Sequence, residues 1–383
     1  MSDLDTHAKA GIAAINERRY EDAVREFQAA LAIDDGRPDL NSALGMAYLQ
    51  RGEVGSAIPH LEKAVALSEP FDAPEHQEMK LHFRVGLASA YEMADQIGDA
   101  RRTLQATVAK WPAQPEPQLQ LAHLLFKTGA IDEGLTAYRA AADHLDDEGK
   151  KVVKAVIEAV GAFRESEHDA GIILLGHASS YSDYFDGIAE DLVKKGWYAE
   201  AARMARGADG EVKPLIPQGA RPYAMQRVDL ADPRTGEVSS VYNEKEAMIV
   251  ALNGLEPLAQ MEILFPWPGQ PFETLVSTHA PWHWLPIILQ THAKLDEKAL
   301  ATLDDAIGDW YLSGFNGDFG DKDSGRFHFV SDPEQIGDNA VQYVFDLGRA
   351  KVEAIGSLLR RLAIVHERLP LRRVILGRGR VAE

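Results

Sequence analysis

The sequence contains no cysteine among its 383 residues. Disulfides, thiolate nucleophiles and cysteine-ligated zinc are therefore excluded, so any metal site would need histidine, aspartate or glutamate ligands. The chain also lacks a run of about 18 apolar residues, and its start, MSDLDTHAKAG, has neither the basic nor the apolar region of a signal peptide. These absences predict a cytoplasmic protein that does not enter a membrane.

Positive charge is scarce as well, since 40 lysines and arginines face 59 aspartates and glutamates, a net charge of −19. Residues 1–167 carry 18 basic and 28 acidic residues (−10), and residues 168–383 carry 22 and 31 (−9). Neither part has the basic excess of a nucleic-acid-binding module. The last 24 residues contain seven arginines, which either meet an acidic partner or phosphate, or balance an acidic body.

A period of 34 residues runs through the first part of the chain. Four units between residue 4 and about residue 148 share small residues at two positions and a large apolar residue at a third. These are Gly11, Gly45, Ala88 and Ala122, then Ala23, Ala57, Ala100 and Gly134, then Phe27, Leu61, Leu104 and Tyr138. The insertion FDAPEHQEM separates the second unit from the third.

Each unit has apolar residues at helical spacing on both sides of a short break such as RGEV, which predicts two antiparallel helices. One such pair cannot bury its own apolar face, so neighbouring pairs must stack. The pattern resembles the tetratricopeptide repeat family, although His7, Asn41, Arg84 and Gln118 stand where that family usually has tryptophan. The amphipathic segment EGKKVVKAVIEAVGAFRES then fits a capping helix, which completes a repeat domain over residues 1–167.

The resemblance implies a superhelix whose concave groove, lined by the first helix of each unit, binds a peptide or helix of a partner protein. Six apolar residues fall at groove positions and are expected to bind the partner: Met46, Leu49, Val85, Met93, Leu119 and Phe126. Lys127 is the sole strong cation at these positions, which disfavours a clamp for a carboxylate terminus. An apolar helix fits better. The alternative is that these side chains pack onto the C-terminal half of the same chain.

Residues 168–383 show no repeat and mix helical with β-rich segments. The patterns predict helices over 171–207, 243–254, 296–315 and 348–368, a hairpin within 223–243, and strands over 259–265, 325–330, 339–348 and 371–377. Helices and strands do not alternate regularly, so the expected class is an α+β domain with a largely antiparallel sheet.

The stretch STHAPWHWLPIILQTHAKLD places His279 and His283 four residues apart. Such a pair forms a metal face only on an unbroken helix, whereas Pro281 lies between the two and Pro286 follows them. The glutamate of the HExxH metalloprotease signature is missing as well. We therefore predict no metal here, but an aromatic and proline-rich loop leading into a short helix that contains His283.

Two classes of function remain for the whole chain. The favoured one is an adaptor or scaffold, in which the repeats bind a partner protein and the C-terminal domain makes a second contact. The alternative is an enzyme of unknown class, with the repeats recruiting its substrate and catalytic residues drawn from His283, Asp318, Asp321 and His328. The hydroxyls near His177 in LLGHASSYSDYFD lack a nucleophile-elbow frame. No motif predicts a cofactor.

Overall fold

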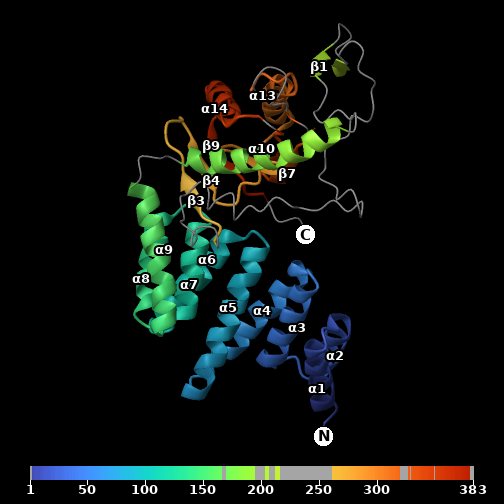
Figure 1. The fold of residues 1–383 in the computed structure, drawn as a ribbon. Coiled ribbons are helices and arrows are strands. Elements are labelled where there is room, and N and C mark those ends of the chain that lie inside the picture. The colour runs from blue at the N-terminus through green and yellow to red at the C-terminus, as the bar shows by residue number, and fades with distance from the viewer. Residues whose placement is uncertain are drawn as a thin grey trace. The chain divides into compact units, whose positions relative to one another are not determined.

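The computed structural model describes residues 2–165, 170–194, 203–206, 212–215, 261–319, 327, 329–348 and 350–379. They form two compact units, which Figure 1 shows as ribbons. The first unit consists of Met1–Leu125 and Ala130–Lys154, and the second of Phe126–Gly129 and Ala155–Arg380. The second unit therefore begins inside a helix and also includes a short inter-helix connection.

The first unit is built from helix pairs, as the 34-residue period predicts. The pairs are α1 (Asp3–Asn16) with α2 (Tyr20–Ile33), α3 (Pro38–Gln50) with α4 (Val54–Ser68), α5 (Gln77–Met93) with α6 (Ile97–Lys110), and α7 (Pro115–Phe126) with α8 (Ile131–Ala142). The 3-10 turn η1 (Pro74–His76) lies in the insertion, and α9 (Asp147–Glu165) follows the last pair. Ser2 caps α1 through a reciprocal pair of hydrogen bonds with Asp5.

The turn inside each pair uses one repeated backbone conformation. Arg18, Gly52, Asp95 and Gly129 occupy equivalent repeat positions, and all four have a positive φ, between 54° and 79°. This left-handed conformation reverses the chain within a few residues, and only glycine adopts it without steric cost. The turns therefore share a geometry even though only two of the four carry glycine.

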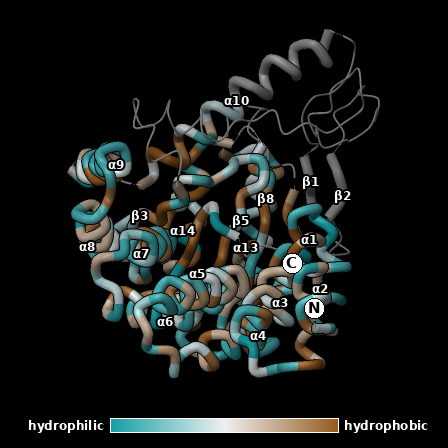
Figure 2. Tube along the Cα trace, turned by 90° about the horizontal axis from the view of Figure 1, so that it is seen from below, coloured by the Kyte–Doolittle hydropathy of each residue, from teal (hydrophilic) through white to brown (hydrophobic). Residues whose placement is uncertain are grey.

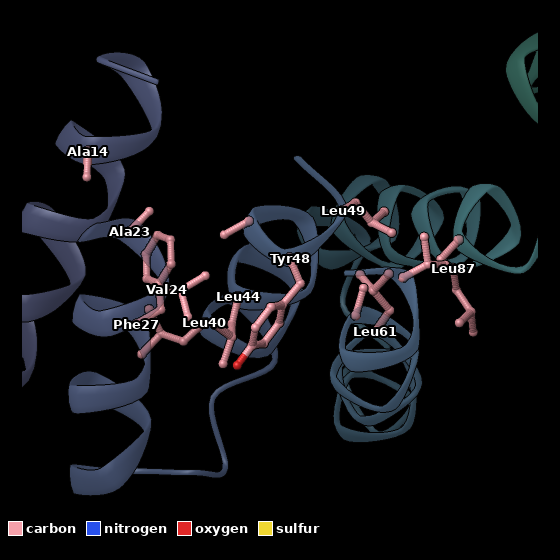
Figure 3. Close-up of a cluster of buried hydrophobic side chains, with 14 of the residues drawn as sticks. Ala14, Ala23, Val24, Phe27, Leu40, Leu44, Tyr48, Leu49, Leu61 and Leu87 are labelled. Atoms are coloured by element: carbon pink, nitrogen blue, oxygen red, sulfur yellow. The ribbon is translucent and has the colours of Figure 1, made fainter. Parts of the chain in front are cut away.

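The core of the first unit lies between the paired helices. Figure 3 shows part of it, with Phe27, Leu44 and Leu61 among the buried side chains. A Cβ added to Gly11 would lie 2.5 Å from the ring of Phe27, and one added to Gly45 would lie 2.6 Å from Leu61 Cγ. The prediction that small residues let the two helices approach closely is therefore confirmed.

The second unit contains a mixed, mostly antiparallel sheet in the order β3-β4-β9-β5-β8-β6, with β7 also pairing with β8. Its strands are β3 (Leu264–Pro266), β4 (Glu273–Ser277), β5 (Leu285–Thr291), β6 (Phe329–Val330), β7 (Glu334–Gly337), β8 (Ala340–Asp346) and β9 (Leu371–Leu376). Only the pairing of β4 with β9 is parallel. A separate antiparallel pair joins β1 (Arg203–Arg206) and β2 (Val212–Leu215).

Three helices accompany the sheet: α10 (Gly171–Lys194), α13 (Glu297–Phe315) and α14 (Glu353–His366). Trp310 of α13 donates its indole N–H to the carbonyl oxygen of Ala354, 2.9 Å away, which links α13 to α14. The hydroxyl of Tyr343 on β8 donates to Asp304 of α13 over 2.6 Å. Hydrophobic residues gather along the strands of the sheet (Figure 2), as the buried pattern of β5 and β8 requires.

The short helix expected to contain His283 is wrong. The chain instead enters β5, which lies between β8 and β9. Pro286 is tolerated there because its carbonyl oxygen accepts a hydrogen bond from Gly377 N–H (2.8 Å). Its missing N–H therefore also faces β9, just beyond the Ile287–Leu376 pair that ends this ladder.

Other predictions for the second unit met different outcomes. The helix predicted over 171–207 ends in α10, and β1 occupies part of its range. The hairpin within 223–243 and the helix over 243–254 lie outside the described residues. The predicted helices at 296–315 and 348–368 are confirmed as α13 and α14, and the last two predicted strands as β8 and β9.

Candidate functional site

The first helices of the units expose large apolar side chains. Ile12 on α1 is 53% exposed, Met46 on α3 is 40% exposed, and Met93 on α5 is 51% exposed. Ile12 and Met46 lie 34 residues apart, at the same position of consecutive units. We call the side of α1, α3 and α5 that carries these three residues the first-helix face.

Met46 and Met93 belong to one continuous surface. A Cβ built at Gly86 of α5 would lie 3.6 Å from the sulfur of Met46, so the Met46 side chain rests against α5 at that glycine. Met93 follows Gly86 by seven residues, which is about two helical turns, so it projects from the same side of α5. The absence of a side chain at Gly86 thus leaves room for Met46 beside the next helix.

The six predicted groove residues are not equally accessible. Leu49, Val85 and Phe126 are buried, whereas Leu119 is half-buried and Met46 and Met93 are exposed. The expectation that all six face solvent is therefore wrong for three of them. Leu49 packs in the core of the first unit with Leu61 and Leu87 (Figure 3).

The burial of Leu49 has a geometric cause. Leu49 follows Met46 by three residues, which turns its side chain about 60° around the helix. Because α3 also contacts α5 directly, that turn places Leu49 in the core that includes Leu87 and Ala90 of α5. Phe126 is the last residue of α7 and belongs to the second unit. A role of the six residues in partner binding stays a prediction, and Met46 and Met93 are the members that solvent reaches.

Ionisable side chains lie at the beginning of the first helices. Asp5, Asp39, His82 and Glu116 occupy equivalent repeat positions and are all exposed. Hydrogen bonds from the Ser2 side chain and backbone hold the pKa of Asp5 below its usual value. Asp39 forms an ion pair with Arg37 at 2.6 Å. The first-helix face is therefore bordered mainly by carboxylates.

The proposed catalytic residues do not assemble in the described part of the chain. The ring of His283 stacks on Tyr181 of α10, with centroids 5.6 Å apart and planes at 16°. Asp318 is exposed and its N–H donates to Ser313 at the end of α13, while Asp321 and His328 lie outside the described residues. Among the residues that the structure describes, no three His, Asp or Glu side chains are grouped to hold a metal ion.

A buried histidine in the second unit escaped the sequence reading. His177 of α10 is fully buried, and its Nε2 lies 3.1 Å from the carbonyl oxygen of Thr278. Burial lowers its pKa to about 4, and the nearby His279 and His283 lower it further, against the hydrogen bond to Thr278. The imidazole is thus neutral at neutral pH and ties α10 to the connection between β4 and β5. Sequence alone offered no signal for this contact, which spans about a hundred residues.

Comparisons with known proteins concern the N-terminal part. No family model and no curated protein matches the chain. Among solved structures, MamA from Desulfovibrio magneticus RS-1 is 17% identical, with 38% of this chain and 76% of that chain covered and a TM-score of 0.33. Yeast Tom70 is 16% identical, with 42% and 33% covered and a TM-score of 0.37.

A third structure is a kinesin light chain from Podosopora anserina with nearly identical TPR-like repeats. It is 21% identical, with 41% of this chain and 83% of that chain covered and a TM-score of 0.35. These structures match the helical repeats, as the resemblance to the tetratricopeptide repeat family predicts. At such identities the likeness concerns the fold and not an activity. Within the described residues, every helix is too short or too polar to cross a bilayer.

Proposed function

We propose that the chain is a protein-interaction scaffold that binds a partner segment along the first-helix face. The observation that carries this proposal is the position of Met46, whose sulfur lies against Gly86 of the next first helix while the side chain stays 40% exposed. The apolar surface therefore continues from α3 to α5 towards Met93. Exposed apolar patches of this kind mark interaction surfaces, and the flexible thioether of methionine adapts to the shape of a partner.

The second unit supplies a further contact in this proposal. Trp284 is 46% exposed and lies parallel to the ring of Phe329, with centroids 6.0 Å apart and planes at 6°. Exposed aromatic side chains are enriched at the centres of protein interfaces. The pair is a separate surface of the scaffold, carried by the sheet and not by the repeats.

Site-specific photo-crosslinking tests the location of the partner. A benzophenone amino acid is placed at position 46 or 93 of the full chain, and at the exposed apolar positions 33 and 152 as matched controls. We expect a discrete crosslinked protein from 46 and 93 and none from 33 and 152. Met46→Glu should then abolish the crosslink from position 93, while circular dichroism of the variant stays unchanged.

Two results would contradict the proposal. Crosslinks of equal yield from all four positions would show that no surface is preferred. A folded Met46→Glu variant that retains the full crosslink from position 93 would show that the two methionines do not share a binding surface.

A further inference from the structure

Negative charge is concentrated in the helices that form the first-helix face. Residues 1–100 contain 18 acidic and 9 basic residues, so this stretch contributes −9 of the total charge of −19. It spans α1 to α5 and the beginning of α6. A partner of this surface therefore meets an anionic field.

The basic residues of this stretch are already engaged with its own carboxylates. Seven of the nine form an ion pair with an aspartate or glutamate of the same stretch: Arg19, Arg25, Arg37, Arg51, Lys63, Lys80 and Arg84. Each pair cancels charge locally. Because acids outnumber bases two to one, the surplus carboxylates have no counterpart among the lysines and arginines of these helices.

Two of the carboxylates are in register with the exposed apolar residues. Asp5 precedes Ile12 by seven residues on α1, and Asp39 precedes Met46 by seven residues on α3. Seven residues are two helical turns, so each carboxylate lies on the same side of its helix as the apolar residue, about 10 Å along the axis. An acidic row thus runs beside the apolar row across two consecutive units.

We infer that the partner segment is a cationic amphipathic helix, with an apolar stripe over Ile12, Met46 and Met93 and lysines or arginines over Asp5 and Asp39. The inference rests on the proposed function and names the chemistry of its partner. An acidic segment would be repelled by the same carboxylates. The attraction acts between solvent-exposed groups, so salt should weaken it.

Three labelled synthetic peptides test the inference on the full chain by fluorescence anisotropy. One is a Leu/Lys helix with an apolar stripe, the second has the same composition in scrambled order, and the third replaces every lysine by glutamate. We expect the striped Leu/Lys peptide to bind at least about tenfold more tightly than the other two. Raising sodium chloride from about 50 to about 500 mM should weaken its binding about tenfold.

Isosteric variants then locate the charge. Asp5→Asn with Asp39→Asn should weaken binding of the striped Leu/Lys peptide about fivefold and flatten its salt dependence. The matched control, Glu21→Gln with Glu133→Gln, removes two exposed carboxylates from the second helices α2 and α8 and should leave the affinity unchanged.

The possible failures are distinguishable. Equal binding of the Leu/Glu and Leu/Lys peptides, both lost in Met46→Ser with Met93→Ser, would overturn the cationic partner and leave the binding surface standing. Equal binding of the scrambled peptide would overturn the amphipathic helix and show attraction by charge alone. Binding that ignores both the methionine and the aspartate substitutions would overturn this inference, and absent crosslinks from positions 46 and 93 would overturn the proposed function itself.

Discussion

Gly11 and Gly45 sit where the two helices of their units come closest. Neither has space for a side chain, because an added Cβ would overlap Phe27 or Leu61. The second small position of each unit is equally confined, since Ala23, Ala57 and Ala100 are completely buried. The repeat is therefore defined at the residue scale by the absence of side-chain volume at the helix–helix contact.

Gly45→Val should consequently destabilise the chain by about 2 kcal/mol, because overpacking of a tight helix contact costs energy of this size. The matched control is Gly55→Ala on α4, where an added Cβ meets nothing within 4 Å. That substitution should leave stability unchanged or raise it slightly. Urea denaturation followed by circular dichroism measures both. A Gly45→Val midpoint equal to that of the unsubstituted protein would show that the contact is looser than described.

His177 makes the stability of the second unit depend on pH. Its pKa is about 4 in the folded chain, against an ordinary value of 6.5. Between these values the unfolded chain binds a proton that the folded chain does not, so this contribution is complete above pH 6.5 and is lost as the pH falls towards 4. At pH 5 the loss should be about 2 kcal/mol.

Denaturation of the full chain at pH 7 and pH 5 tests this expectation. His177→Gln should reduce the loss of stability between the two values, because the titrating group is gone. His144→Gln, at an exposed histidine, controls for the removal of one imidazole. An unchanged pH dependence in His177→Gln would mean that other groups cause the acid sensitivity.

The four helix pairs share one turn geometry despite different residues at its left-handed position. Gly52 has a φ of 77° and Arg18 a φ of 56°. Glycine adopts this conformation freely, whereas a residue with a Cβ pays a steric cost. The element therefore tolerates Arg18 and Asp95 because tertiary packing of the helices holds the turn in place.

Substitution at this position should act in opposite directions in the two turns. Gly52→Ala should destabilise by about 1 kcal/mol, although an added Cβ has open space, since the cost lies in the backbone. Arg18→Gly should be neutral or stabilising. Thermal unfolding midpoints compare the two. A stabilising Gly52→Ala would show that the turn is free to leave the left-handed conformation.

The same comparison explains which elements the sequence predicts. The helix pairs follow from local periodicity and from small residues at fixed spacing, and the structure confirms them. Strand β5 does not follow, because Pro281 and Pro286 indicate a loop locally while the strand is specified by β8 and β9, which lie about 50 and 80 residues further along the chain. The exposed members of the binding surface were predictable, but the burial of Leu49 depends on how closely α5 approaches α3.

At the scale of the whole molecule, the repeats form a unit of their own. Helix pairs are stabilised by contacts with neighbouring pairs, so residues 1–165 should fold without the rest of the chain. Because α9 belongs to the second unit from Ala155 on, we expect its last turns to fray in the fragment. Urea denaturation should give a cooperative helical transition, with rapid hydrogen exchange confined to 155–165. A fragment without a cooperative transition would show that the repeats need the second unit.

The central claim is that a partner covers Met46 and Met93. The chain has eight methionines, and methyl NMR of the methionine-labelled full chain can follow them individually during titration with the protein crosslinked at position 46. We predict that the signals of Met46 and Met93 shift together, while those of Met79 and Met261 stay in place. Shifts at Met79 or Met261 with Met46 and Met93 unmoved would contradict the account.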